Sequence, residues 1–228
     1  MGPDLSSPLL SEPPLLTSAE HVRSIVFDLD GTLYINAGLQ REIGAAAEEL
    51  VSRSRGISPR RGAELLRGAR ERLTESLDRE PTLTQTCVEL GLSVQELHRV
   101  FQDFIRPENY LVYDPVLQAL LDSLRDYCSL YIYTNNNLPL TRKILALLGV
   151  EEMFDRLYTI EFRWVPKPDP VTLQLLLEDI GGPPESFLFI GDRHQVDLQP
   201  AAELGIPTLL VSETADLLQI HQLLGLLP

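Results

Sequence analysis

Cysteine is scarce in this sequence, and long apolar stretches are missing from it. Cys87 and Cys128 are its only two cysteines. They form neither a metal-binding pattern nor a disulfide framework, which favours a reducing compartment and two buried apolar side chains. No apolar run approaches the ~20 residues that a membrane-spanning helix requires. We therefore expect a cytoplasmic protein that does not act in a membrane.

Positive charge is also scarce. The 228 residues carry 19 Lys and Arg against 33 Asp and Glu, a formal net charge of -14. Such a chain gains nothing from general attraction to nucleic acid or to an anionic membrane, so neither is expected as a partner. A small anionic substrate is still compatible, because one metal ion or one lysine can reverse the local potential. The oligomeric state is left open.

The first twenty residues lack the basic residues that targeting segments use. They contain four prolines and three acidic residues but no Lys or Arg. A signal peptide needs a basic start and an unbroken apolar stretch, and a transit peptide needs arginine. We expect residues 1–20 to form a flexible N-terminal arm.

What the chain does have is an ordinary globular balance, with 44% hydrophobic and 23% charged residues. Residues 36–112 show apolar side chains at the three- and four-residue spacing of helices. Ser58-Pro59 and Ser93 are typical helix starts, and Gly56 and Gly91 are typical helix ends. About four helices are predicted in this section.

From residue 114 onward, short apolar runs alternate with helical stretches. The runs are SLYIYT, RLYTIE, SFLFIGD and PTLLVS, and the helical stretches are PLTRKILALLG, PVTLQLLLEDIG, LQPAAELG and a last helix near 214–225. Together with the run at 25–27, this indicates an α/β fold, with a Rossmann-like parallel sheet covered by helices on both faces. The expected core spans residues 21–35 and 113–228, and residues 36–112 are an inserted helical cap domain.

Ligands bind at the carboxyl ends of the strands in such sheets, so the residues that follow each run matter most. The first run ends in Asp28 and Asp30, whose side chains point to the same face of an extended chain. Two carboxylates so placed repel each other, and burial costs each of them free energy. A nearby cation would remove this conflict.

The later strand ends also carry polar groups. They are Thr134 with Asn135, Asn136 and Asn137; Lys167 between two prolines; and Gly191-Asp192 followed by Asp197. Each set alone has a plain structural interpretation, as a helix cap, a surface lysine or a turn. Together they favour a site for Mg²⁺ and phosphate, because carboxylates suit the metal, while lysine and helix N-terminal amides suit the anion.

This ordered set resembles the four motifs of the haloacid dehalogenase-like hydrolase superfamily, over about residues 22 to 212. The section after the first strand resembles that family's first type of helical cap. The resemblance implies that Asp28 is the nucleophile, which forms an aspartyl-phosphate, and that Asp30 is the general acid and base. Thr134, the Asn135 amide and Lys167 would hold the phosphoryl oxygens.

The resemblance further implies that Mg²⁺ is bound by Asp28, by the backbone carbonyl of Asp30 and by Asp192. Asp197 would be a further ligand through water, or would orient the other ligands. Members of the family that remove halogen lack an acid at the position of Asp30 and use no Mg²⁺, so Asp30 and Asp192 favour phosphoester chemistry.

Some residues depart from the family pattern or have no assigned role. Arg193, His194 and Val196 replace the small or polar residues usual after Gly-Asp, and His194 is interpreted as an exposed loop residue. Residues 53–72 hold seven arginines, which could bind a second anionic group of the substrate or a partner, but which we interpret as a solvated, ion-paired helix face. Tyr34 and Trp164 are candidates for the mouth of the site or for packing between core and cap.

The leading hypothesis is a phosphatase for small phosphomonoesters that depends on Mg²⁺. A sugar phosphomutase on the same fold is the alternative, and a non-catalytic interaction protein is a third. The partner is expected to be a small phosphorylated metabolite, and nucleotides, sugar phosphates and short phospho-acids all remain open.

Overall fold

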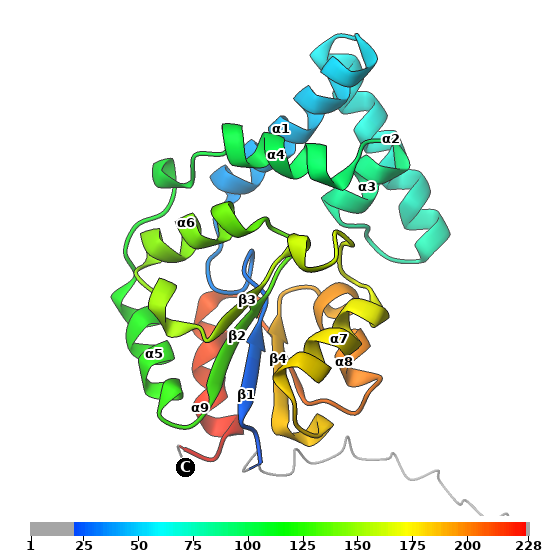
Figure 1. Ribbon diagram of the computed structural model, residues 1–228. Coiled ribbons are helices and arrows are strands. Elements are labelled where there is room, and N and C mark those ends of the chain that lie inside the picture. Colours follow the sequence, from blue (N-terminus) through cyan, green and yellow to red (C-terminus); the bar gives the residue numbers. More distant parts are fainter. Residues whose placement is uncertain (1–20, 227–228) are drawn as a thin grey trace, which may run out of the picture.

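The computed structural model describes residues 21–226 (Figure 1), so the arm expected over residues 1–20 lies outside the described residues. Five parallel strands form one sheet in the order β3-β2-β1-β4-β5. The strands are β1 Ser24–Phe27, β2 Ser129–Tyr133, β3 Arg156–Tyr158, β4 Phe187–Gly191 and β5 Thr208–Leu210. The predicted α/β fold with a parallel sheet is confirmed.

Strand β1 lies at the centre of the sheet because its residues are apolar on both faces. All four are buried, and Phe27 aligns with Ile132 of β2 and with Ile190 of β4. The residues that follow these three positions therefore emerge at one edge of the sheet. This register places the polar ends of β1, β2 and β4 side by side.

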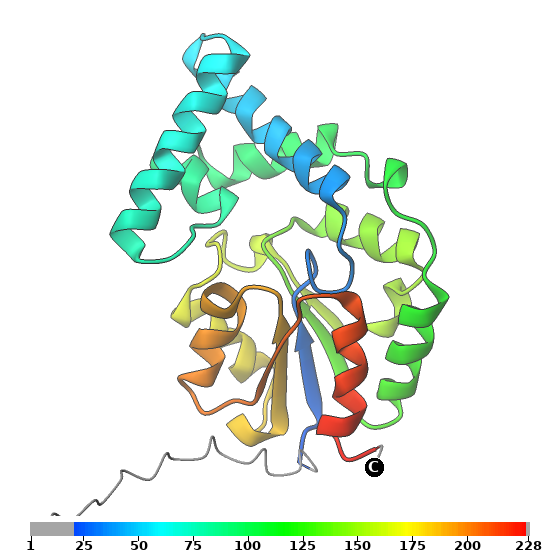
Figure 2. The same cartoon turned by 180° about the vertical axis from the view of Figure 1, so that it is seen from behind.

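Helices cover both faces of the sheet, and each face has its own apolar cluster (Figures 1 and 2). The side chains of Ile25, Phe27 and Ile132 pack with helices α5, Pro115–Arg125, α6, Leu138–Leu148, and α9, Gln219–Leu223. The alternate side chains, among them Val26 and Phe189, pack with α7, Pro170–Ile180, and α8, Gln199–Ala202. The alternation of a buried strand thus fills both layers.

Four further helices form a group over the carboxyl edge of the sheet, which we call the helical lobe (Figures 1 and 2). They are α1 Ala37–Arg55, α2 Pro59–Leu77, α3 Leu83–Glu89 and α4 Val94–Phe104. Ser58 and Ser93 accept backbone hydrogen bonds as N-caps, and Gly56 ends α1 with φ 61°. The number of helices and these boundaries match the prediction. Whether residues 36–112 move as a cap domain stays a prediction.

Some elements differ from the sequence prediction. Helix α5 was not predicted, although Asp114 caps it and Pro115 stands in its first turn. The stretch RLYTIE forms a strand of only three residues and then a 3₁₀ turn, Ile160–Phe162. The predicted helix at 198–205 is shortened to α8, because a π-helical turn, His194–Leu198, precedes it. The last helix is divided into a 3₁₀ turn, Thr214–Leu218, and α9.

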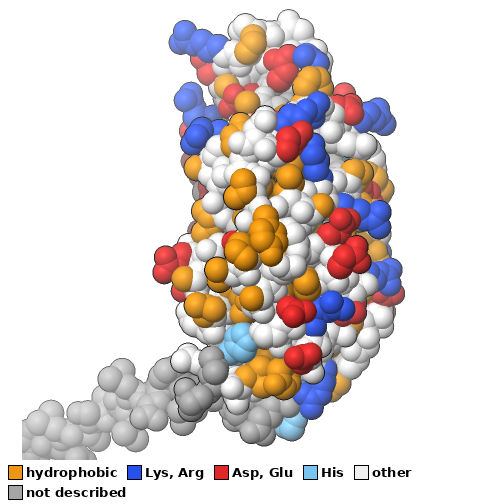
Figure 3. Space-filling view, turned by 90° about the vertical axis from the view of Figure 1, so that its left-hand side faces the viewer, with side chains coloured by type: hydrophobic (Ala, Val, Ile, Leu, Met, Phe, Trp, Pro, Cys, Tyr) orange, Lys and Arg blue, Asp and Glu red, His pale blue; other side chains and the backbone are white. Residues whose placement is uncertain are grey.

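The surface of the helical lobe carries ion pairs between neighbouring turns. In α2, Arg60 lies 3.3 Å from Glu64, and Arg67 lies 3.9 Å from Glu71. On the face drawn in Figure 3, acidic and basic side chains are interspersed. These contacts agree with the interpretation of the arginine-rich section as a solvated face. Within residues 21–226, no helix combines the length and the apolar character needed to cross a membrane.

Candidate active site

Asp28 and Asp30 follow β1 where the chain leaves the sheet. The Asp28 backbone N–H still donates to Ile190 of β4, at 2.8 Å, and the Asp28 side chain is buried. The chain then turns at Gly31, with φ 89°, and the Gly31 N–H donates to the Tyr34 carbonyl. This tight loop keeps both carboxyl groups at the edge of the sheet.

Lys167 connects three parts of this edge. Its ammonium donates to Asp28 Oδ1 at 2.6 Å, to Asp197 Oδ1 at 2.7 Å and to the Tyr133 carbonyl at 2.8 Å. The residue is 3% exposed. Burial acts to lower the pKa of Lys167, but the charges of Asp197 and Asp28 outweigh it and raise that pKa. The lysine is therefore a buried, charged group beside Asp28.

Three carboxylates gather next to this lysine. One oxygen from each of Asp28, Asp192 and Asp197 lies within 4.8 Å of the others. Burial raises the pKa of Asp28 to about 8 against the opposing charge of Lys167, and burial and Asp197 raise the pKa of Asp192 to about 6. It is therefore unfavourable for these carboxyl groups to be ionised at the same time. A hard divalent cation fits this oxygen donor set.

Asp197 accepts a hydrogen bond at each of its two carboxylate oxygens. One of its oxygens accepts from Lys167, and the other accepts from the Arg193 N–H at 3.0 Å. Of the two roles that the resemblance implies for this residue, the hydrogen bonds favour that of orienting the site. Whether it binds metal stays a prediction.

Two glycines allow this close approach of acids. A Cβ at Gly31 would collide with the carboxylate of Asp192, and one at Gly191 would collide with the side chain of Asp197. The Gly191-Asp192 pair is thus more than a turn, because the absence of a side chain at residue 191 makes room for Asp197.

Asp30 is held from two sides. Its Oδ1 accepts a short hydrogen bond from the Tyr34 hydroxyl, and its Oδ2 accepts from Asn136 Nδ2 at 2.6 Å. Burial raises the pKa of Asp30, while the hydrogen bond from Tyr34 opposes that rise. Burial and the neighbouring Asp30 also raise the pKa of Tyr34, which keeps its hydroxyl protonated as a donor. Sequence reasoning missed both contacts.

Each residue of the polar run after β2, residues 134–137, makes different contacts. Thr134 Oγ1 accepts from the Asn136 N–H at 3.1 Å, and Asn135 Oδ1 accepts from the Lys167 N–H at 2.7 Å. Asn137 caps α6 and donates to the His98 carbonyl of the helical lobe at 2.8 Å. The simple helix-cap interpretation therefore applies to Asn137, while Asn135 and Asn136 position groups of the site.

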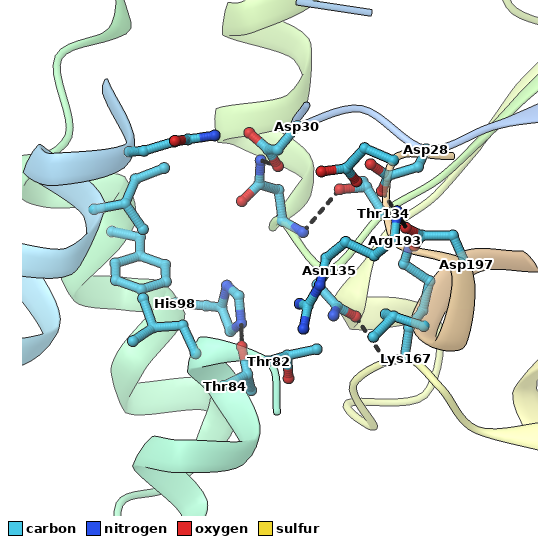
Figure 4. Close-up of a pocket in the computed structure, with 17 residues that line it drawn as sticks. Asp28, Asp30, Thr82, Thr84, His98, Thr134, Asn135, Lys167, Arg193 and Asp197 are labelled. Carbon is cyan, nitrogen blue, oxygen red and sulfur yellow. Dashed lines mark hydrogen bonds and ion pairs between the residues drawn. The ribbon is translucent and has the colours of Figure 1, made fainter. Parts of the chain in front are cut away.

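The helical lobe forms the other wall of a cavity of about 260 Å³ (Figure 4). All the predicted site residues line it. The lobe contributes Gln40, Ile43, Thr82, Leu83, Thr84, His98 and Phe101. Burial lowers the pKa of His98 to about 4, so its imidazole is neutral at pH 7, and Nε2 lies 3.5 Å from Thr84 Oγ1. Sequence reasoning missed this wall, because its residues show only ordinary helix periodicity.

The residues that depart from the family pattern occupy different places. Arg193 lines the cavity, and its Nη2 donates to the carbonyls of Glu80 at 2.7 Å and Pro81 at 3.3 Å. His194 is exposed and lies outside the lining of this cavity, in agreement with its interpretation as a loop residue. Trp164 is half-buried and also lies outside that lining.

Fold and site together define an α/β enzyme whose acids and lysine meet at the carboxyl edge of a parallel sheet. A family model described as haloacid dehalogenase-like hydrolase matches residues 22–205. Because the match covers most of the chain, this protein belongs to the haloacid dehalogenase-like hydrolases. The resemblance inferred from the four motifs is confirmed, and so is the prediction of a hydrolase.

Relatives and solved structures agree with this membership. The chain is 28% identical over 198 residues to a phosphoglycolate phosphatase of Yersinia pestis, covering 82% of this chain and 80% of the relative. It is 26% identical over 215 residues to a phosphoglycolate phosphatase of Salmonella typhi, covering 85% and 82%.

Among solved structures, a HAD phosphatase from Thermococcus onnurineus has a TM-score of 0.59 at 24% identity, covering 90% of this chain and 98% of that one. A 2-haloacid dehalogenase from Pseudomonas syringae pv. Tomato has a TM-score of 0.57 at 18% identity, with the same coverages of 90% and 98%. These structural likenesses establish the fold, which a phosphatase and a dehalogenase share.

Proposed function

We propose that this protein is a Mg²⁺-dependent phosphatase that hydrolyses a small phosphomonoester through an aspartyl-phosphate on Asp28. The observation that carries the proposal is the contact between Lys167 and Asp28, in a cavity that also contains Asp30 and the carboxylate of Asp192. A nucleophile, a proton carrier, a phosphate-binding cation and a metal-binding acid thus face one space. Relatives named as phosphoglycolate phosphatases support phosphoester chemistry.

The first half-reaction transfers the phosphoryl group to the protein. A carboxylate oxygen of Asp28 attacks phosphorus, and the bond between phosphorus and the ester oxygen breaks. Asp30 gives its proton to the departing oxygen, so that the alcohol leaves neutral. Lys167, the Thr134 hydroxyl and the Asn135 amide bind the phosphoryl oxygens and offset the negative charge that develops on them.

The second half-reaction restores the enzyme. Asp30, now ionised, takes a proton from a water molecule whose oxygen attacks phosphorus. The bond between phosphorus and Asp28 breaks, and inorganic phosphate leaves. Asp30 is thereby protonated again and Asp28 is again a carboxylate. The hydrogen bonds from Tyr34 and Asn136 orient Asp30 in both halves.

Asp28, Asp192 and the backbone carbonyl of Asp30 are the groups that would hold Mg²⁺, and the ion would favour the ionised form of Asp28 and neutralise phosphoryl charge. This matters because burial raises the pKa of Asp28 to about 8. Burial thus disfavours the ionised form of Asp28 that the attack on phosphorus requires.

The size of the cavity supports a small substrate. Ligand pockets commonly measure roughly 300–1,000 Å³, and about 260 Å³ lies just below that range. A short phosphomonoester fits this space better than a nucleotide does, and a neighbouring cavity of about 1020 Å³ shares Gln40, Leu83, Asp192 and Arg193 with it. We therefore propose a small phosphorylated metabolite as the partner, in the cytoplasm.

Turnover of p-nitrophenyl phosphate tests this function. We expect hydrolysis with Mg²⁺, loss of hydrolysis with a chelator, and a decrease of about 10³-fold or more in Asp28→Asn. The exposed Asp103 of α4, changed to Asn, provides a control for the loss of one acidic charge. Unchanged activity in Asp28→Asn would refute the assignment. Isomerisation of a sugar phosphate faster than phosphate release would favour the phosphomutase instead.

A further inference from the structure

Arg193 is a cation of the cavity wall, and its charge opposes the rise in the pKa of the adjacent Asp192. The cavity is lined by four acids, Asp28, Asp30, Asp192 and Asp197, and by two cations, Lys167 and Arg193. Lys167 is ion-paired with Asp28 and Asp197. Among residues 21–226, no ion pair includes Arg193. The Arg193 side chain extends across the cavity from the side of Asp28 toward Thr82 (Figure 4).

The side-chain hydrogen bonds of Arg193 are with uncharged groups. Its Nη2 donates to the carbonyls of Glu80 and Pro81, and the Arg79 guanidinium also donates to the Glu80 carbonyl, at 3.4 Å. Burial and the charge of Arg193 together lower the pKa of Arg79. The Glu80 carboxylate is bound by a third arginine, Arg70. Two like charges thus converge at one carbonyl, an arrangement that an added anion would relieve.

A guanidinium has five N–H donors in a rigid planar fork. The side-chain hydrogen bonds of Arg193 use only Nη2. The remaining edge matches a carboxylate, which accepts two parallel hydrogen bonds from arginine. Asp28 and Arg193 line the same cavity of about 260 Å³, so a short substrate with its phosphoryl group at Asp28 would share that space with the Arg193 side chain. A second phosphate would add more negative charge beside four acids than a carboxylate does.

We propose that Arg193 binds the carboxylate of the substrate, and that the substrate is the phosphomonoester of a short hydroxy acid with two or three carbons. This inference rests on the proposed phosphatase function. Arg193 then determines specificity, while the phosphoryl group is bound by Lys167 and Thr134. Arg193, which departs from the family pattern, is then the residue that distinguishes acidic from neutral esters.

The competing explanation is mechanical, because the bonds from Arg193 to residues 80 and 81 also tie the helical lobe to the loop after β4. A purely mechanical role would affect every substrate by the same factor. A carboxylate-binding role affects acidic substrates alone. The ratio of kcat/KM for an acidic ester to that for a neutral ester of equal length separates the two roles.

The test compares 2-phosphoglycolate with 2-hydroxyethyl phosphate, in which a hydroxymethyl group replaces the carboxylate. Wild type should prefer the acid by about 10- to 100-fold in kcat/KM, the range expected for a charge-assisted pair of hydrogen bonds. Arg193→Gln should bring this ratio close to one, and Arg193→Lys should leave an intermediate ratio, because lysine keeps the charge but loses the fork. His194→Gln, at the neighbouring exposed position, should keep the wild-type ratio.

A ratio in Arg193→Gln equal to that of wild type would overturn the proposal and assign Arg193 the mechanical role. If the variants do not fold, wild type decides, since a preference for the neutral ester overturns the proposal and a preference for the acid supports it. Failure of wild type to hydrolyse p-nitrophenyl phosphate with Mg²⁺ would refute the phosphatase function itself. That outcome is distinct from hydrolysis without acid preference, which refutes the Arg193 assignment alone.

Discussion

The Asp30 carboxyl group has a hydrogen-bond donor at each oxygen, Tyr34 at one and Asn136 at the other. Both donors are buried, at 6% exposure each. A proton carrier has to present one oxygen to the leaving group and later to water, so its orientation is part of its function. We therefore propose that Tyr34 positions Asp30, a more specific role than lining the mouth of the site.

We expect Tyr34→Phe to slow the hydrolysis of esters with poor leaving groups selectively. The kcat/KM for an alkyl phosphate should decrease about 10- to 100-fold, because departure of an alkoxide needs the proton from a well-placed Asp30. For p-nitrophenyl phosphate, whose leaving group departs without a proton, the decrease should be less than about threefold. Steady-state kinetics with both substrates checks this.

The exposed Tyr113, changed to Phe, is the matched control, since its hydroxyl contacts only Gln118 in the described part of the chain. Equal losses on both substrates in Tyr34→Phe would show that Tyr34 supports the fold rather than the orientation of Asp30.

At this scale the sequence predicted residues that line one cavity, but not how they contact one another. Asp28 and Asp192 were predictable because each directly follows a strand, and Lys167 because it lies in the loop after β3, since parallel strands bring such ends together. The contact of Asn136 with Asp30 joins residues 106 positions apart. No local pattern specifies such a contact, and the same holds for His98.

Helix α2 contains two glycines in contrasting environments. Gly62 faces α1, where a Cβ would lie 2.9 Å from the Glu48 carbonyl oxygen and collide with the Ser52 hydroxyl. At Gly68 the nearest atom to a Cβ would be the mobile end of Arg72, at 3.6 Å. The first glycine lets two helices approach closely, and the second only weakens its helix.

Alanine substitutions at these positions should change stability in opposite directions. Gly62→Ala is expected to destabilise the protein by about 1–3 kcal/mol, because the Glu48 backbone cannot move aside without displacing α1. Gly68→Ala should stabilise it by up to about 1 kcal/mol through helix propensity. Thermal unfolding measures both, at about 2–4 °C per kcal/mol for a chain of this length. Stabilisation by both substitutions would contradict the close packing of α1 against α2.

Elements were predictable where a periodic run has capping residues at its ends, as at Ser58 and Ser93. Helix α5 has such signals in Asp114 and Pro115, and a stricter use of capping residues would have found it. The shortening of α8 could not be predicted, because the π-helical turn before it aims Asp197 at Lys167. A local helical preference gives way there to a tertiary contact.

The molecule as a whole encloses polar groups between the sheet and the helical lobe. His98 is 2% exposed, and its neutral form is held against Thr84. Its pKa of about 4 in the folded protein compares with an ordinary value of 6.5. Between these values the unfolded chain binds a proton that the folded protein does not, so the contribution of His98 to stability is present above pH 6.5 and is lost as the pH falls toward 4.

This linkage predicts a measurable difference between wild type and His98→Gln. From pH 7.5 to pH 5, wild type should lose about 2 kcal/mol more unfolding free energy than the variant does. Comparing the two proteins cancels the contribution of Asp28, whose raised pKa acts in the opposite direction. Urea unfolding at both pH values gives the result, with His194→Gln as a control. Equal losses in wild type and His98→Gln would show that His98 takes up a proton without unfolding.

The fold class was predictable at this scale, because buried apolar runs that alternate with helices indicate one architecture. A helical section inserted after the first strand was predictable too, but the contacts that hold the helical lobe over the carboxyl edge, such as that of Asn137 with the His98 carbonyl, were not. The side chains of the cavity wall were therefore invisible in the sequence.

The central claim is that phosphorus becomes bonded to Asp28 during turnover. Acid quenching of wild type during Mg²⁺-dependent hydrolysis of p-nitrophenyl phosphate, followed by peptide mass spectrometry, tests it directly. We predict one added phosphoryl group on the peptide that contains Asp28, and none in Asp28→Asn. A phosphoryl group on another residue, or hydrolysis at the wild-type rate in Asp28→Asn, would contradict the account.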